Sequence, residues 1–178
     1  MGWTAPFTAV AGTAWKAADW NTYGRDNLAW LATDSPACRA YNSAAISHTT
    51  TGAWQALTFN SERFDNASMH STASNTSRFT IPTGGGGKYL CGAVFEFGSN
   101  ATGFREAGIE VNGTSFVAVS ATVSVGAGAG TAMTITTATS LAAADYVEVM
   151  AWQNSGGALN VTNNANYSPE GWVMWFRT

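Results

Sequence analysis

From Pro36 to the C-terminus, short runs of apolar and β-branched residues alternate with turn residues that recur about every ten positions. The Asn112-Gly113 pair between two such runs is a strong hairpin signal, because both residues tolerate the left-handed backbone of a two-residue turn. No helical pattern separates the runs, so we expect an all-β antiparallel protein, either a sandwich or a barrel. The predicted strands are 37–46, 53–59, 78–81, 88–97, 105–111, 115–123, 132–137, 145–153, 158–162 and 171–176.

The first 36 residues have a different pattern. Trp20, Gly24, Leu28 and Leu31 lie at helical spacing, which predicts a short helix over 13–33. Pro36 disfavours helical backbone at the residue before it, so the helix should end there. We therefore divide the chain into an N-terminal segment, 1–36, and a β domain, 37–178. A lone aromatic helix must dock on the rest of its chain, on a sister chain or on a scaffold.

The composition excludes several classes of function. Charged residues make up only 11% of the 178 residues and the net charge is −3, so no basic patch for nucleic acid is expected. No apolar run approaches 18 residues, which predicts no membrane span, and no secretory signal is visible. Cys38 and Cys91 are too few for a disulfide framework, and we expect two buried free thiols, with a bond between them as the alternative.

Catalytic patterns are missing as well. The two histidines, His48 and His70, do not have metal-ligand spacing, and no Gly-x-Ser-x-Gly motif is present. We expect Asp65 and His70 to fasten a loop through hydrogen bonds rather than to form a catalytic or metal-binding pair. The sequence thus predicts a protein that is not an enzyme and has no catalytic residues, cofactor or metal.

Three predicted strands, 88–97, 145–153 and 171–177, are apolar on both faces, whereas 105–111 alternates apolar and polar residues. A sheet buried on both sides needs a partner, and a symmetric homo-oligomer is the usual one; the alternative is that the N-terminal helix covers the second face. The residues predicted at the subunit interface are Tyr89, Phe95, Phe97, Tyr146, Met150, Trp152, Trp172, Met174 and Phe176.

Four short motifs carry a resemblance to a known family: Gly87-Lys88-Tyr89-Leu90, Asn112-Gly113-Thr114, Ala144-Asp145-Tyr146-Val147-Glu148-Val149 and Gly171-Trp172-Val173-Met174. Over residues 38–178 the chain resembles the globular heads of complement and their tumour-necrosis-factor-like relatives, although Ala144 stands where that family usually has glycine. The resemblance implies a ten-stranded jelly roll that assembles as a tight trimer. It also implies that the first strand, the Gly-x-Tyr strand, the Asp-Tyr strand and the last strand form the inner, trimer-facing sheet.

A second resemblance concerns bacteriophage proteins. The motifs Trp20-Asn21-Thr22 and Arg25-Asp26-Asn27-Leu28 are similar to an N-terminal segment of phage tail and virion proteins. The stretches 59–65, 153–160 and 167–170 look like phage versions of the jelly roll. The resemblance implies assembly in the host cytoplasm, where thiols stay reduced, and location on the virion. The residues predicted to attach the protein to the particle are Trp3, Trp15, Trp20, Arg25, Asp26, Leu28, Trp30 and Leu31.

The function expected from these observations is that of a non-enzymatic phage structural protein, a homotrimer on the virion surface. We favour a tail-associated protein (minor tail, tip or fibre), whose loops 99–103, 126–130 and 154–157 face outward toward a host-surface glycan or protein. The alternatives are a capsid decoration or head-fibre protein, and a lectin-like adhesion module outside a virion. The expected partners are other copies of the chain and other virion proteins.

Overall fold

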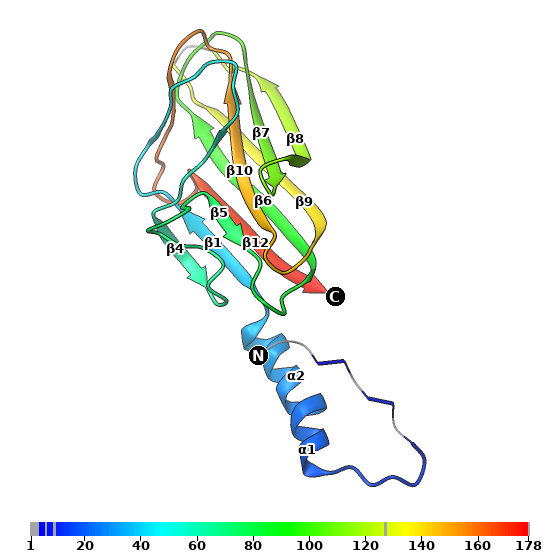
Figure 1. Ribbon diagram of the computed structural model, residues 1–178. Coiled ribbons are helices and arrows are strands. Elements are labelled where there is room, and N and C mark those ends of the chain that lie inside the picture. The colour runs from blue at the N-terminus through cyan, green and yellow to red at the C-terminus, as the bar shows by residue number, and fades with distance from the viewer. Residues whose placement is uncertain (1–3, 6, 9, 127, 178) are drawn as a thin grey trace.

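The computed structural model describes residues 4–5, 7–8, 10–126 and 128–177, which form a β-sandwich with a helical arm at one end (Figure 1). The arm has four consecutive helical stretches with continuous right-handed helical backbone at their junctions. Two of the stretches are wound as π-helix. They are α1 (Ala17–Asp19), η1 (Trp20–Asp26), α2 (Asn27–Ala29) and η2 (Trp30–Asp34). In the part of the chain that the structure describes, no helix is long and apolar enough to cross a membrane.

The sandwich consists of two antiparallel sheets. The seven-stranded sheet has the order β2-β11-β6-β12-β1-β4, with β9 pairing along β6; its strands are β1 (Ala37–Tyr41), β2 (Ile46–His48), β4 (Ser61–Asp65), β6 (Gly87–Phe97), β9 (Thr131–Leu141), β11 (Leu159–Val161) and β12 (Glu170–Arg177). The five-stranded sheet has the order β3-β10-β7-β8, with β5 pairing along β10; its strands are β3 (Gln55–Ala56), β5 (Arg78–Thr80), β7 (Phe104–Val111), β8 (Ser115–Val123) and β10 (Tyr146–Gln153).

The core lies between the sheets and follows the two-residue period of the strands. On β6, Tyr89, Phe95 and Phe97 point inward and are fully buried. From the opposite sheet, Val147 and Val149 on β10 point toward them and are about as well covered. The expected all-β sandwich with a short N-terminal helix is therefore confirmed.

Two predictions about the interface are wrong. The Asp-Tyr strand, β10, lies in the five-stranded sheet, and the long strand beside β6 is β9 instead. Tyr89, Phe95 and Phe97 are covered by their own chain, so they offer no surface to a second subunit. The error arose because β6 is apolar on both faces, and periodicity alone does not tell which of two apolar faces is the core.

Some strand boundaries also differ from expectation. The predicted strand 37–46 is split into β1 and β2 around a turn at 42–45, where Asn42 and Asn60 bind backbone groups that would otherwise pair in a ladder. Only Gln55–Ala56 of the predicted strand 53–59 forms β3. Strand β4 was not predicted, because its Ser61–Asp65 segment is mostly polar and lies at the edge of its sheet.

The arm is fastened to the sandwich at its C-terminal end. Trp30 is buried and packs edge-on against Trp175 of β12, with ring centroids 4.5 Å apart. The amide of Asn66 donates hydrogen bonds to the carbonyls of Thr33 and Ser35, 3.3 and 3.0 Å away. Strand β1 then begins at Ala37, and the division into domains 1–36 and 37–178 stays a prediction.

Candidate subunit interface

The outer face of the seven-stranded sheet carries a group of apolar side chains that nothing in the described chain covers completely. Inward and outward positions alternate, so the residues next to buried Cys91, Ala93 and Val173 face out. We call this group the outer apolar face; its members are Phe64 on β4, Leu90 and Val94 on β6, and Trp172, Met174 and Phe176 on β12. Phe64 is 45% exposed and Phe176 is 49% exposed.

Trp172 is held in place by the glycine opposite it. The strand register pairs Trp172 with Gly92 of β6, and the indole ring occupies the space where a Cβ at position 92 would lie. Beside the indole is a shallow hollow lined by Arg39, Phe64, Val94, Trp172 and Met174. Such a hollow on a sheet face can receive an apolar side chain from another molecule.

The strand beside β6 keeps this face flat. Its outward positions are Ala132, Thr134, Thr136 and Ala138, which pair with Glu96, Val94, Gly92 and Leu90 of β6. All four side chains are small and exposed. A row of small residues lets another sheet or helix approach closely, so β9 extends the surface available for contact beyond the aromatic side chains.

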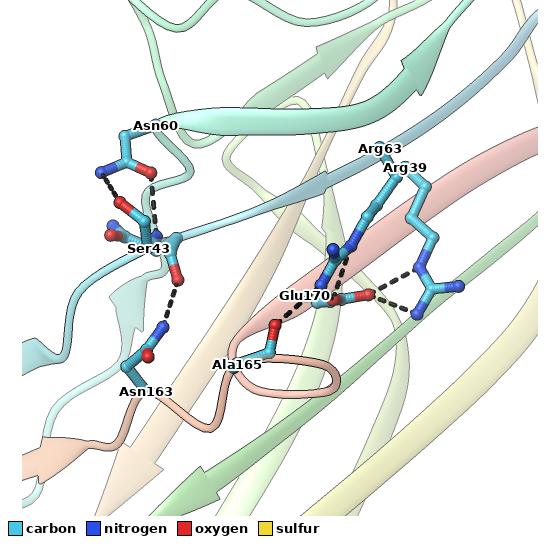
Figure 2. Close-up of polar contacts among 8 residues, drawn as sticks. Arg39, Ser43, Asn60, Arg63, Asn163, Ala165 and Glu170 are labelled. Atoms are coloured by element: carbon cyan, nitrogen blue, oxygen red, sulfur yellow. Dashed lines mark hydrogen bonds and ion pairs between the residues drawn. The ribbon is translucent and has the colours of Figure 1, made fainter.

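A buried carboxylate, Glu170, lies on the same face of the sheet, beside these apolar side chains. The side chain of Glu170 is 1% exposed, and both of its oxygens are bound by arginines. Arg39 Nε donates to Oε2 at 2.6 Å, and Arg63 Nη2 donates to Oε1 at 2.5 Å (Figure 2). The hydrogen bond to Glu170 raises the pKa of Arg63 above its ordinary value. The cluster carries one surplus positive charge.

The two arginines come from different strands and are anchored differently. Arg63 also donates to the carbonyl of Ala165 at 3.0 Å and lies over the ring of Tyr41, 4.3 Å from its centroid. Arg39 is bound only by Glu170 among the described residues, and its side chain is 39% exposed. Figure 2 shows both guanidinium groups converging on the one carboxylate. The cluster therefore ties β1, β4 and β12 together at this face.

The structure places the nine predicted interface residues in three locations. Tyr89, Phe95 and Phe97 are in the core, and Trp172, Met174 and Phe176 are on the outer apolar face. Tyr146, Met150 and Trp152 lie on β10, on the outside of the other sheet. Sequence reasoning missed Leu90, Val94 and Phe64 as interface candidates.

The predicted attachment residues are similarly divided. Trp15, Trp20, Leu28 and Leu31 are 46–63% exposed on the arm. Trp30 is instead buried against the sandwich, so it fastens the arm and is wrong as an attachment residue. Arg25 and Asp26 form an ion pair with each other at 2.8 Å. Trp3 lies outside the described residues.

Polar candidates from the sequence have structural roles. Asp65 accepts hydrogen bonds from the backbone N–H groups of Ala67, Met69 and His70, so the predicted loop fastener is confirmed. Cys38 and Cys91 are buried free thiols, as expected, and both pair with Val173, which separates them. Among the described residues there is no group of three side chains suited to holding a metal ion.

The sheet order and the two packed layers define an antiparallel jelly roll of the tumour-necrosis-factor and complement-head type. Solved structures similar to the chain include murine APRIL, with a TM-score of 0.57 and 10% identity over 78% of this chain and 98% of that one. Eiger TNF from S. frugiperda has a TM-score of 0.54 and 14% identity over 80% and 94% of the two chains. The globular domain of zebrafish complement 1qA protein has a TM-score of 0.52 and 14% identity over 81% and 99%.

Likeness at this level of identity establishes the fold alone. No protein-family model matches the chain. No curated protein sequence matches it either.

Proposed function

We propose that the chain is a non-enzymatic structural protein of a bacteriophage particle and that it works as a homotrimer. The observation that carries the trimer is the outer apolar face: large side chains such as Trp172, Met174 and Phe64 gather on one flat surface of the sheet. Covering apolar area contributes roughly 25 cal/mol per Å², so this surface favours association. The resemblance of the sequence to a trimeric family favours three copies over two.

The helical arm supports a role in attachment. It extends from one end of the sandwich (Figure 1). Its Trp15, Trp20, Leu28 and Leu31 side chains are exposed. Exposed tryptophans are suited to a protein contact because Trp is among the residues that supply most of the binding energy of interfaces, and the leucines add apolar area that a partner can cover. We infer that the arm joins the trimer to another virion protein, with a tail-associated position favoured and capsid decoration or a head fibre as the alternative.

The oligomeric state tests the trimer directly. In sedimentation equilibrium at micromolar concentration, we expect the full chain to have the mass of three copies. Met174→Asp places a charge on the outer apolar face and should give a folded monomer. Val119→Asp, an equally apolar-to-acid change on the other sheet, should leave the trimer intact. A monomeric wild-type chain, or a Met174→Asp variant that is still trimeric, would overturn the proposal.

Incorporation into particles tests the attachment role. Leu28→Asp with Leu31→Asp should prevent the trimer from joining the virion, whereas Thr22→Asp, an exposed polar position of the same arm, should not. Immunogold labelling of intact particles then separates tail from capsid. Normal incorporation of the double variant, or a virion without label, would contradict the assignment.

A further inference from the structure

The outer face of the five-stranded sheet has two pairs of aromatic side chains. Trp54 and Phe116 lie with ring centroids 4.7 Å apart. Phe104 and Trp152 are stacked, with centroids 4.9 Å apart and an angle of 29° between the rings. Phe104 is 37% exposed and Phe116 is 39% exposed. This surface is on the opposite side of the sandwich from the outer apolar face, and we call it the aromatic platform.

Gly108 of β7 allows the rings of Trp54 and Phe116 to pack directly against the backbone of the sheet. A Cβ at Gly108 would be 2.6 Å from the ring of Phe116 and 3.2 Å from the ring of Trp54. Both rings therefore rest against the bare backbone of β7. Rings that lie against a sheet are rigid, so little conformational entropy is lost when a ligand stacks on them.

Three glutamates share this face with the aromatic rings. Glu106 and Glu110 flank Gly108 on β7 at the outward positions, and Glu148 stands directly opposite Glu110 on β10. Glu106 stands opposite Trp152 in the same register. Carboxylates thus alternate with rings along the platform.

Glu110 is a largely covered carboxylate of this face. It is only 9% exposed, yet no residue that the structure describes donates a hydrogen bond to it. Its neighbour Glu148 accepts a hydrogen bond from Ser77 Oγ at 2.6 Å and lies 3.6 Å from Arg78 Nε. Burial, and then the charge of Glu148, raises the pKa of Glu110. The carboxylate oxygens of Glu110 are not fully enclosed, so they are open to hydrogen bonds from the hydroxyl groups of a ligand.

We propose that the aromatic platform binds neutral pyranose units of a polysaccharide. The C–H face of a pyranose ring carries partial positive charge and stacks on the negative face of an aromatic ring. The hydroxyl groups at the edge of the sugar donate to carboxylates such as Glu110. Among the described residues of this face, three glutamates outnumber the one cation, Arg78, and the resulting negative charge disfavours acidic polysaccharides. The site lies within one chain and does not depend on the trimer.

Native gel electrophoresis with polysaccharide in the gel tests this assignment. The neutral probes are dextran, mannan, galactan and a mixed-linkage β-glucan, and alginate is the acidic one. We expect at least one neutral polysaccharide to slow the full chain and alginate not to slow it. Trp152→Ala and Phe116→Ala should each weaken this retardation at least tenfold. Tyr167→Ala, an exposed aromatic position elsewhere (45% exposed), should leave it unchanged.

A conservative variant distinguishes loss of binding from loss of folding. Glu110→Gln keeps the shape of the side chain and should also weaken retardation, while its circular dichroism spectrum and sedimentation remain those of the wild type. Failure of all four neutral probes would overturn the proposal, as would retardation that survives both aromatic substitutions or that is equal with alginate. Sedimentation of the same samples reports the trimer separately, so either idea can fail without the other.

Discussion

The indole of Trp172 lies across Gly92 of the neighbouring strand and fills the volume that any larger residue there would need. This contact joins the two central strands of the seven-stranded sheet at the middle of the outer apolar face. It also fixes the orientation of the largest side chain of that face.

Gly92→Ala should therefore act on both stability and assembly. Its methyl group displaces the indole, and overpacking of this kind costs about 1–3 kcal/mol of unfolding free energy. We expect a lower urea midpoint and a weaker trimer. The matched control is Gly157→Ala, where a Cβ meets nothing within 4 Å and the change should stay within about 0.5 kcal/mol. Equal stabilities for the two variants would contradict this account of Trp172.

Two carboxylates should give opposite dependences of stability on pH. Burial raises the pKa of Glu110 above 4.5, so the native state holds a proton that the unfolded state releases. The resulting stability is complete below pH 4.5 and is lost as the pH rises through the native pKa. Glu110→Gln should match the wild type at about pH 4 and exceed it at about pH 7 in urea unfolding.

Asp145 should show the opposite pH dependence of stability. A hydrogen bond from Asn112, followed by one from the backbone of Ala142, lowers the pKa of Asp145 below 3.8. Its stabilisation is present above that value and disappears as the pH falls through the native pKa. Asp145→Asn should be less stable than the wild type near neutral pH, and the gap should narrow in acid. Parallel curves for the two variants would refute the assignment.

We expect the thiols of Cys38 and Cys91 to be unreactive toward alkylating reagents in the native protein. Burial raises the pKa of Cys91 to about 12. Burial, and next the charges of Asp65 and Glu62, raises that of Cys38. Since only the thiolate is nucleophilic, iodoacetamide should label neither residue in the native protein and both in guanidinium. Thr72→Cys, at an exposed loop position, should label at once. Rapid native labelling of either buried thiol would be evidence against the core described above.

Trp30 should control the helical arm. Its ring is covered by the sandwich, so Trp30→Ala removes a buried aromatic contact worth about 3–5 kcal/mol. We expect trypsin to cut after Lys16 and Arg25 at least tenfold faster, as local opening becomes easier, while the sandwich survives. Trp20→Ala, at a ring that is 57% exposed, should alter this rate much less. Unchanged cleavage of the Trp30 variant would show that other contacts hold the arm.

The sequence was sufficient for the class of fold because period-two patterns and turn residues are local signals. The Asn112-Gly113 hairpin between β7 and β8 lies where it was expected, with both residues at positive φ. Pairing between distant strands is not local. Strand β10 has apolar residues on both faces, and nothing in its own residues tells whether Trp152 covers a subunit interface or an outer surface. Its placement depends on pairing with β7, some forty residues away.

Only part of the outer apolar face could be predicted, because the face that each strand turns toward the core depends on distant strands. Trp172 and Met174 were identified because the last strand is apolar throughout. On β6, the interface prediction chose the large aromatic residues instead of leucine and valine. Large side chains are, however, needed most in the core, where they fill the space between the sheets. Leu90 and Val94, which face out, were therefore overlooked. The burial of Trp30 could not be predicted from the helix alone, because the ring that covers it, Trp175, lies at the opposite end of the sequence.

Because β10 and β6 belong to different sheets, the aromatic platform and the outer apolar face share no strand. On the proposed assignments, substitutions on the aromatic platform leave the residues of the proposed subunit interface unchanged. Under those proposals, the binding specificity of the platform could evolve while the subunit interface stays constant.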